Sequence, residues 1–139
     1  MTAPGSHRPG IEHNQVDFSG PSKSTVFRNF GPKSFMEHLA NIPAKEIRPG
    51  FFGKMVHGEK STLTIWEIKK GSRLPEHNHP HEQITLVLDG ELEMIIGGTK
   101  YVLTSGATHA IPSNVPHSAF ALTDCKVIDS FAPARDDYR

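Results

Sequence analysis

Four residues in the second half of the chain combine side chains and spacing suited to binding a metal ion: His77, His79, Gln83 and His117. Side chains alternate between the two faces of a strand, so His77 and His79 would point the same way and Gln83 would rejoin them. On a helix, two histidines two positions apart would point roughly 200° away from each other. The pattern therefore predicts an extended segment that holds one divalent metal ion together with His117. The alternative is a group of loop histidines beside Pro80.

The donor types restrict the chemistry of this predicted site. Imidazole and carboxamide donors without thiolate suit Zn, Ni, Fe, Mn or Co, so the identity of the ion stays open. A neutral Gln83 leaves the charge of the ion uncompensated, which favours polarising a substrate oxygen over redox chemistry with oxygen. Glu82 is the alternative fourth ligand, but it lies an odd number of residues from His79 and would face outward on a regular strand.

A second group of candidate residues lies near the C-terminus. Val127, Asp129 and Phe131 would share one face of a strand. If that face points inward, Asp129 is a carboxylate in an apolar cavity, where burial raises its pKa, a nearby cation lowers it, and proton transfer near neutral pH becomes feasible. Arg135 offers a fork of N–H groups that binds anionic groups in two places at once, and Phe131 offers a flat apolar face. The alternative is that Asp129 and Arg135 pair to fix the C-terminus, with Phe131 in the core.

The composition of the chain restricts its expected partners and cellular setting. The 15 Lys and Arg balance the 15 Asp and Glu, which predicts no nucleic-acid partner and no attraction to an anionic membrane. No apolar segment approaches the roughly 20 residues needed to span a bilayer. The single cysteine, Cys125, cannot form an internal disulfide, which favours a reducing, cytoplasmic setting.

Glycine and proline at short intervals favour an all-β fold of short strands joined by tight turns. Residues 1–24 contain few large apolar side chains and are predicted to form a flexible N-terminal arm before a single domain over residues 25–139. One or two helical turns are expected near residues 35–40, packed over a sheet or a second subunit. Asp89-Gly90, between two apolar runs, predicts a hairpin. Strands are expected at about residues 46–56 (two pieces), 61–68, 84–88, 91–96, 99–103, 107–111, 116–122 and 126–131.

Two segments, residues 71–90 and 106–121, resemble the two motifs of the cupins: Gly71-x5-His77-x-His79-x3-Gln83-x6-Gly90, and Gly106-x5-Pro112-x-Asn114-x2-His117. The resemblance implies a double-stranded β-helix, or jelly-roll barrel, with a short N-terminal extension and one divalent metal inside. The chain departs from the usual cupin pattern at three positions. Gln83 replaces the usual glutamate ligand, and Asn114 and Ala121 replace a glycine and an asparagine of the second motif.

The sequence resembles most the small single-domain cupins of pectin degradation, the KdgF-like group, in which a glutamine ligand is expected. Two of the segments that carry this similarity are His79-Pro80-His81-Glu82-Gln83-Ile84 and Asp129-Ser130-Phe131-Ala132-Pro133-Ala134-Arg135-Asp136-Asp137-Tyr138. The resemblance implies a homodimeric enzyme that opens the ring of 4,5-unsaturated monouronates, small anionic sugar acids, in pectin or alginate breakdown. It also implies Asp129 as acid and base, Arg135 as anchor and Phe131 as wall. The alternatives are another metal-dependent cupin enzyme, such as a dioxygenase, lyase or cyclase, and a non-catalytic small-molecule-binding cupin.

Overall fold

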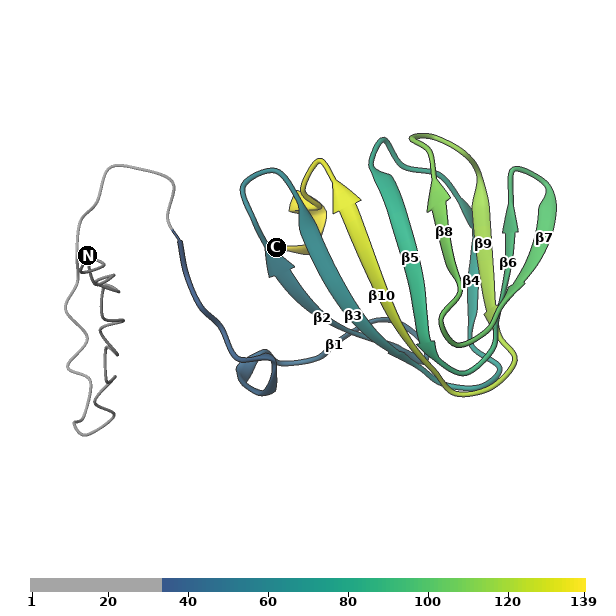
Figure 1. Ribbon diagram of the computed structural model, residues 1–139, viewed down its shortest axis with the longest axis horizontal. Helices are drawn as coiled ribbons and strands as arrows, with labels where there is room; N and C mark the ends of the chain where they lie inside the picture. The colour runs from purple at the N-terminus through teal and green to yellow at the C-terminus, as the bar shows by residue number, and fades with distance from the viewer. Residues whose placement is uncertain (1–33) are drawn as a thin grey trace, which may run out of the picture. The chain divides into compact units, whose positions relative to one another are not determined.

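The computed structural model describes residues 34–139, which form two antiparallel β-sheets facing each other (Figure 1). The six-stranded sheet has the order β1-β2-β3-β10-β5-β8, and the four-stranded sheet has the order β4-β9-β6-β7. The strands are β1 Lys45–Arg48, β2 Phe51–His57, β3 Thr62–Ile68, β4 Arg73–His77, β5 Glu82–Asp89, β6 Leu92–Ile96, β7 Thr99–Leu103, β8 Thr108–Ile111, β9 His117–Ala121 and β10 Cys125–Ala132. Two 3-10 turns, η1 Leu39–Asn41 and η2 Asp136–Tyr138, precede and follow them. The predicted all-β jelly-roll barrel is confirmed.

The last strand lies in the middle of the larger sheet. β10 pairs with β3 on one side and with β5 on the other, although β3 and β5 come much earlier in the chain (Figure 1). The burial of β10 alternates along its length, and the prediction that Val127, Asp129 and Phe131 share an inward face is confirmed. Asp129 is thereby flanked across the sheet by Thr64 of β3 and Thr85 of β5.

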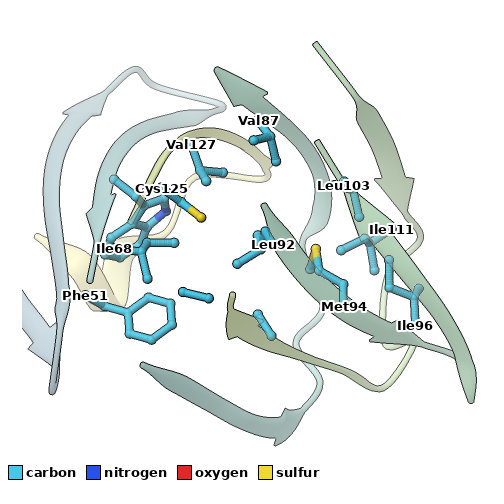
Figure 2. Packing of buried hydrophobic residues seen from close by; sticks show 13 residues of the cluster. Phe51, Ile68, Val87, Leu92, Met94, Ile96, Leu103, Ile111, Cys125 and Val127 are labelled. Carbon is cyan, nitrogen blue, oxygen red and sulfur yellow. The ribbon is translucent and has the colours of Figure 1, made fainter. Parts of the chain in front are cut away.

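The apolar core fills the space between the two sheets (Figure 2). It forms because strands that alternate apolar and polar residues turn one face inward, and both sheets contribute such faces. The four-stranded sheet contributes Leu92, Met94 and Ile96 from β6, and the six-stranded sheet contributes Val87 and Val127 among others. The core occupies one part of the barrel, while polar side chains from the same inward faces gather nearby.

The predicted hairpin at Asp89-Gly90 is wrong. β5 and β6 belong to different sheets, so the turn between them carries the chain from one sheet to the other. Gly90 adopts φ 92°, and a Cβ there would collide with the carbonyl oxygen of Asp124 and the hydroxyl of Thr123. Glycine is needed here for two reasons. A two-residue hairpin turn would also require its positive φ, but not the close approach of Asp124 and Thr123.

The N-terminal expectations meet the structure only in part. The helical turn falls at Leu39–Asn41, later and shorter than predicted. Phe35 and Met36 are exposed, so their expected packing over the sheet is wrong, and the alternative of packing against a second subunit stays a prediction. The predicted arm, residues 1–24, lies outside the described residues, as does the start of the predicted domain at residue 25. Within residues 34–139 no helix is long and apolar enough to cross a membrane.

Candidate metal centre

Three predicted ligands converge at the end of β4 and the start of β9, neighbouring strands of the four-stranded sheet. His77 ends β4, and His117 begins β9 directly opposite it in register. His79 lies in the connection between β4 and β5, and one ring nitrogen from each of the three histidines lies within 4.8 Å of the others. The prediction that one extended strand carries both His77 and His79 is wrong, because β4 ends at His77. A backbone contact holds His79 instead: the N–H of Asn114 donates to the His79 carbonyl oxygen at 2.8 Å.

Asn114 occupies the position where the cupin pattern usually has glycine. Its φ of 63° lies in the left-handed region, which asparagine tolerates better than most residues. The substitution therefore preserves the turn that presents the N–H to His79.

Each of the three histidines is held by the same kind of hydrogen bond. Nδ1 of His77, His79 and His117 lies 2.9, 3.0 and 2.8 Å from the carbonyl oxygens of Pro75, His81 and Val115, respectively. A carbonyl oxygen only accepts, so each Nδ1 carries the proton and each Nε2 presents a lone pair. Burial lowers the pKa of all three imidazoles, which favours this neutral form. This is the tautomer and charge state of histidine ligands in metal sites.

Gln83 completes the donor set in a way that calls for a cation. Its carboxamide oxygen lies 3.2 Å from Nε2 of His79, so two acceptors face each other. The contact is unfavourable unless a positive charge lies between or beside these atoms. Nε2 of His117 is also buried, and it has no hydrogen-bond partner within residues 34–139. The three histidine nitrogens, with the Gln83 oxygen beside that of His79 and no carboxylate or thiolate among them, fit a divalent metal ion.

The competing fourth ligand points the other way. β5 alternates, so Gln83 is buried and Glu82 is exposed. The structure therefore brings Gln83, and not Glu82, beside the histidines. The amide nitrogen of Gln83 donates to the hydroxyl of Thr85 at 3.0 Å.

Asp129 is the hydrogen-bond acceptor of Thr85, which in turn accepts from Gln83. Its two carboxylate oxygens accept from Nε1 of Trp66 at 2.8 Å and from the hydroxyl of Thr85 at 2.6 Å. Burial raises the pKa of the Asp129 carboxyl, and the hydrogen bonds from Thr85 and Trp66 oppose this shift. The alternative that Asp129 simply pairs with Arg135 to fix the C-terminus is wrong, because Asp129 bonds to Trp66 and Thr85.

Arg135 is buried and held from several sides. Its Nε and Nη2 donate to the two carboxylate oxygens of Asp137 at 2.9 and 2.7 Å. Its guanidinium lies over the rings of Tyr138 and Phe131, 4.0 and 4.9 Å from their centroids. The Arg135 guanidinium holds the pKa of the Asp137 carboxyl below its usual range. The fork is thus positioned in advance, with Asp137 as its current partner.

A single cavity of about 230 Å³ connects all of these groups. One part of its wall is polar and contains the four predicted ligands together with Asp129 and Arg135. The other part is apolar and includes Phe51, Ile68, Leu92, Met94 and Val127. The cavity therefore combines a polar end suited to an oxygen-rich group with an apolar inner wall.

Four residues of the site escaped the sequence prediction: Trp66, Thr85, Asp137 and Tyr138. The bond from Trp66 to Asp129 spans 63 positions of sequence. The only available signal for Thr85 was its parity with Gln83, two residues away on the same predicted strand. Asp137 and Tyr138 follow Arg135 closely, and an acidic residue two positions after an arginine gave no reason to expect a pair.

Comparisons with known proteins agree with the fold. A family model described as a cupin domain matches residues 64–131. The pectin degradation protein KdgF of Dickeya dadantii is 29% identical over 99 residues, which cover 69% of this chain and 90% of that protein. The solved structure of KdgF from Halomonas sp. superposes with a TM-score of 0.73 at 28% identity, covering 77% of this chain and 100% of that chain.

A second relative shares higher identity over a smaller part of its length. Quercetin 2,3-dioxygenase of Bacillus subtilis is 49% identical over 98 residues, which cover 63% of this chain. The chain spans only 28% of the length of that relative.

Proposed function

This chain belongs to the cupin superfamily, and we propose that it is a metal-dependent enzyme that opens the ring of 4,5-unsaturated monouronates to linear keto sugar acids. The observation that carries the proposal is the gathering of a neutral His₃Gln donor set, Asp129, Phe131 and Arg135 around one cavity. The similarity to KdgF over 90% of that protein's length supports the substrate class.

The reaction is an isomerisation that asks little of the protein beyond binding and proton transfer. The anomeric hydroxyl loses a proton as the bond between the anomeric carbon and the ring oxygen breaks, which gives an aldehyde. The released enol takes up a proton on carbon and becomes a ketone, so no atom is gained or lost. A divalent ion bound at the site would supply Lewis acidity toward a substrate oxygen.

The side chains of the cavity account for the remaining requirements. Arg135 binds the substrate carboxylate, using the guanidinium nitrogen outside the Asp137 pair or displacing Asp137. Phe131, buried between His79 and Arg135, provides a flat wall for the sugar ring. Asp129 is the carboxyl group of the cavity wall that transfers the proton.

The test is to mix metal-loaded protein with 4,5-unsaturated galacturonate and to follow the absorbance of the conjugated enol-ether acid. We expect this absorbance to fall faster than in the spontaneous reaction. Asp129→Ala, assayed at a metal concentration that saturates its site, should lose the acceleration. Asp89→Ala, which removes an exposed carboxylate of β5, is the matched control and should remain active. Absence of any acceleration with metal confirmed bound would refute the proposal.

The apolar inner wall favours a second candidate, an oxygenase acting on a planar, largely apolar compound. A sugar acid offers hydroxyl groups that side chains such as Phe51, Leu92 and Met94 cannot satisfy. The 49% identity to part of quercetin 2,3-dioxygenase points the same way. Oxygen consumption by the metal-loaded protein on addition of quercetin would support this candidate, and its absence would count against it.

The homodimer and the cytoplasmic setting stay predictions. Sedimentation equilibrium of the purified chain at micromolar concentration would measure the first, with a mass of twice 15.3 kDa as the expected result.

A further inference from the structure

The set of metal ligands does not by itself explain the orientation of the Gln83 carboxamide. Without a metal, the opposite orientation of the Gln83 carboxamide would be more favourable, because the Nε2 lone pair of His79 would then accept from the amide nitrogen of Gln83. The observed orientation instead turns the carboxamide oxygen toward Nε2 of His79 at 3.2 Å. Some other contact must therefore outweigh this preference.

That contact is the hydroxyl of Thr85. Asp129 accepts at both oxygens, from Trp66 at 2.8 Å and from Thr85 at 2.6 Å, so the single hydroxyl proton of Thr85 is committed to Asp129. The Thr85 oxygen then has only lone pairs left for Gln83. Only the NH₂ end of the carboxamide satisfies them, and it donates to Thr85 at 3.0 Å. A flipped Gln83 would place its oxygen against another acceptor.

We propose that Thr85 is a positioning residue that keeps the carboxamide oxygen of Gln83 turned toward the three histidines and so completes the metal site before the metal arrives. The proposal rests on the metal site of the proposed function and is independent of its substrate. Thr85 is 1% exposed, so water does not compete for its hydroxyl, and cross-strand pairing fixes it opposite Asp129. Asp129 therefore acts on the metal site through Thr85, in addition to any role toward substrate.

Co²⁺ binding tests this role without any substrate. Affinity is measured by competition with a chelator, and the visible absorption of bound Co²⁺ reports its ligand geometry. Thr85→Val keeps the shape of the side chain and removes the hydroxyl, so the carboxamide is free to turn its NH₂ toward His79. We expect affinity to fall about 10- to 100-fold, as for other partners that orient metal ligands, with a changed absorption band. Thr85→Ser keeps the hydroxyl and should restore both.

Two comparisons separate positioning from a general disturbance. Thr64→Val is the matched control, because Thr64 is equally buried and flanks Asp129 from the opposite strand without touching Gln83 in any hydrogen bond within residues 34–139. It should leave Co²⁺ affinity within about twofold. In a Gln83→Ala background, Thr85→Val should add less than about twofold, since the group it positions is gone.

Several results would overturn the proposal. They are wild-type affinity and absorption in Thr85→Val, equal losses in the Thr64 and Thr85 variants, or fold-losses of Thr85→Val and Gln83→Ala that multiply in the double variant. If Thr85→Val does not fold, exchange of the Gln83 side-chain amide protons in the wild-type protein decides: protection supports the bond to Thr85, and exchange as fast as in free glutamine refutes it. A wild-type protein that binds no Co²⁺ would refute the metal site itself, a result distinct from failure of Thr85 alone.

Discussion

Replacement of His117 by alanine is the sharpest test of the metal centre. His117 is 1% exposed, its Nδ1 is fixed by the Val115 carbonyl at 2.8 Å, and its buried Nε2 is free to bind a metal ion. His109 offers a matched control, since it is partly buried, bonds through Nδ1 to the carbonyl of Ala110 and packs on Tyr101 outside the cluster. His117→Ala should bind metal much more weakly, and His109→Ala should bind it as the wild type does.

The size of the effect follows from ligand number. Structural zinc sites with four ligands bind with about 10–16 kcal/mol, or roughly 3 kcal/mol per ligand, so loss of one ligand weakens binding on the order of 100-fold. At a metal concentration of 100 times the wild-type Kd, metal stabilises the wild-type fold by about 2.7 kcal/mol, but a variant with 100-fold weaker binding by only about 0.4 kcal/mol. For a domain of this size these values correspond to rises in Tm of roughly 10 °C and 2 °C.

Thermal unfolding with and without metal measures this difference directly. Comparing each variant with its own metal-free form removes the cost of the cavity left by the imidazole, and His109→Ala should show the full rise in Tm. An equal metal-induced rise in His117→Ala and wild type would refute the assignment of His117 as a ligand.

Three further predictions concern the surroundings of the site and the fold. Arg135→Lys loses the bidentate fork, worth about 1.5–3 kcal/mol, and should raise the KM for the unsaturated uronate roughly 10- to 100-fold, whereas Arg139→Lys should leave it unchanged. Burial raises the pKa of the Cys125 thiol above its usual 9.0, so the stability due to the neutral thiol is complete below that value and lost as pH rises through the higher folded pKa. Urea unfolding of wild type and Cys125→Ala across alkaline pH should show a steeper loss in wild type, and parallel curves would contradict this. Gly90→Ala should destabilise by about 1–3 kcal/mol in denaturant titrations, more than Gly98→Ala, where a Cβ meets no atom within 4 Å; equal losses would contradict the role given to Gly90.

The sequence predicted side-chain positions correctly where the alternation of a strand alone decides which face a residue occupies. The alternation of β10 correctly gave the inward face of Asp129 and Phe131, because a strand leaves only two choices of face. The same logic brought Gln83, rather than Glu82, to the histidines. It failed for His79, because the chain leaves β4 at His77 and the common direction of the two imidazoles comes from the Asn114 contact to His79.

Contacts that depend on strand pairing could not be predicted in this way. The Trp66–Asp129 bond requires β10 to insert between β3 and β5. No residue pattern in these three strands predicts which of them pair. The turn at Gly90 shows the same limit, since Asp-Gly chemistry suits both a hairpin and a crossing between sheets. The choice between them is made by the loop around Asp124, which closes over the glycine from a distant part of the chain.

The pairing of β5 with β10 also explains why a neutral ligand suits position 83. Thr85 stands between Gln83 and the buried carboxylate of Asp129, and its single proton is donated to Asp129. A glutamate at position 83 would be a second buried acceptor that Thr85 could not satisfy, and its charge would add to that of Asp129 in the same apolar surroundings. Glutamine supplies the carboxamide oxygen to the histidines and a donor to Thr85 at once. Removing the charge at position 129 would therefore favour a glutamate ligand at position 83.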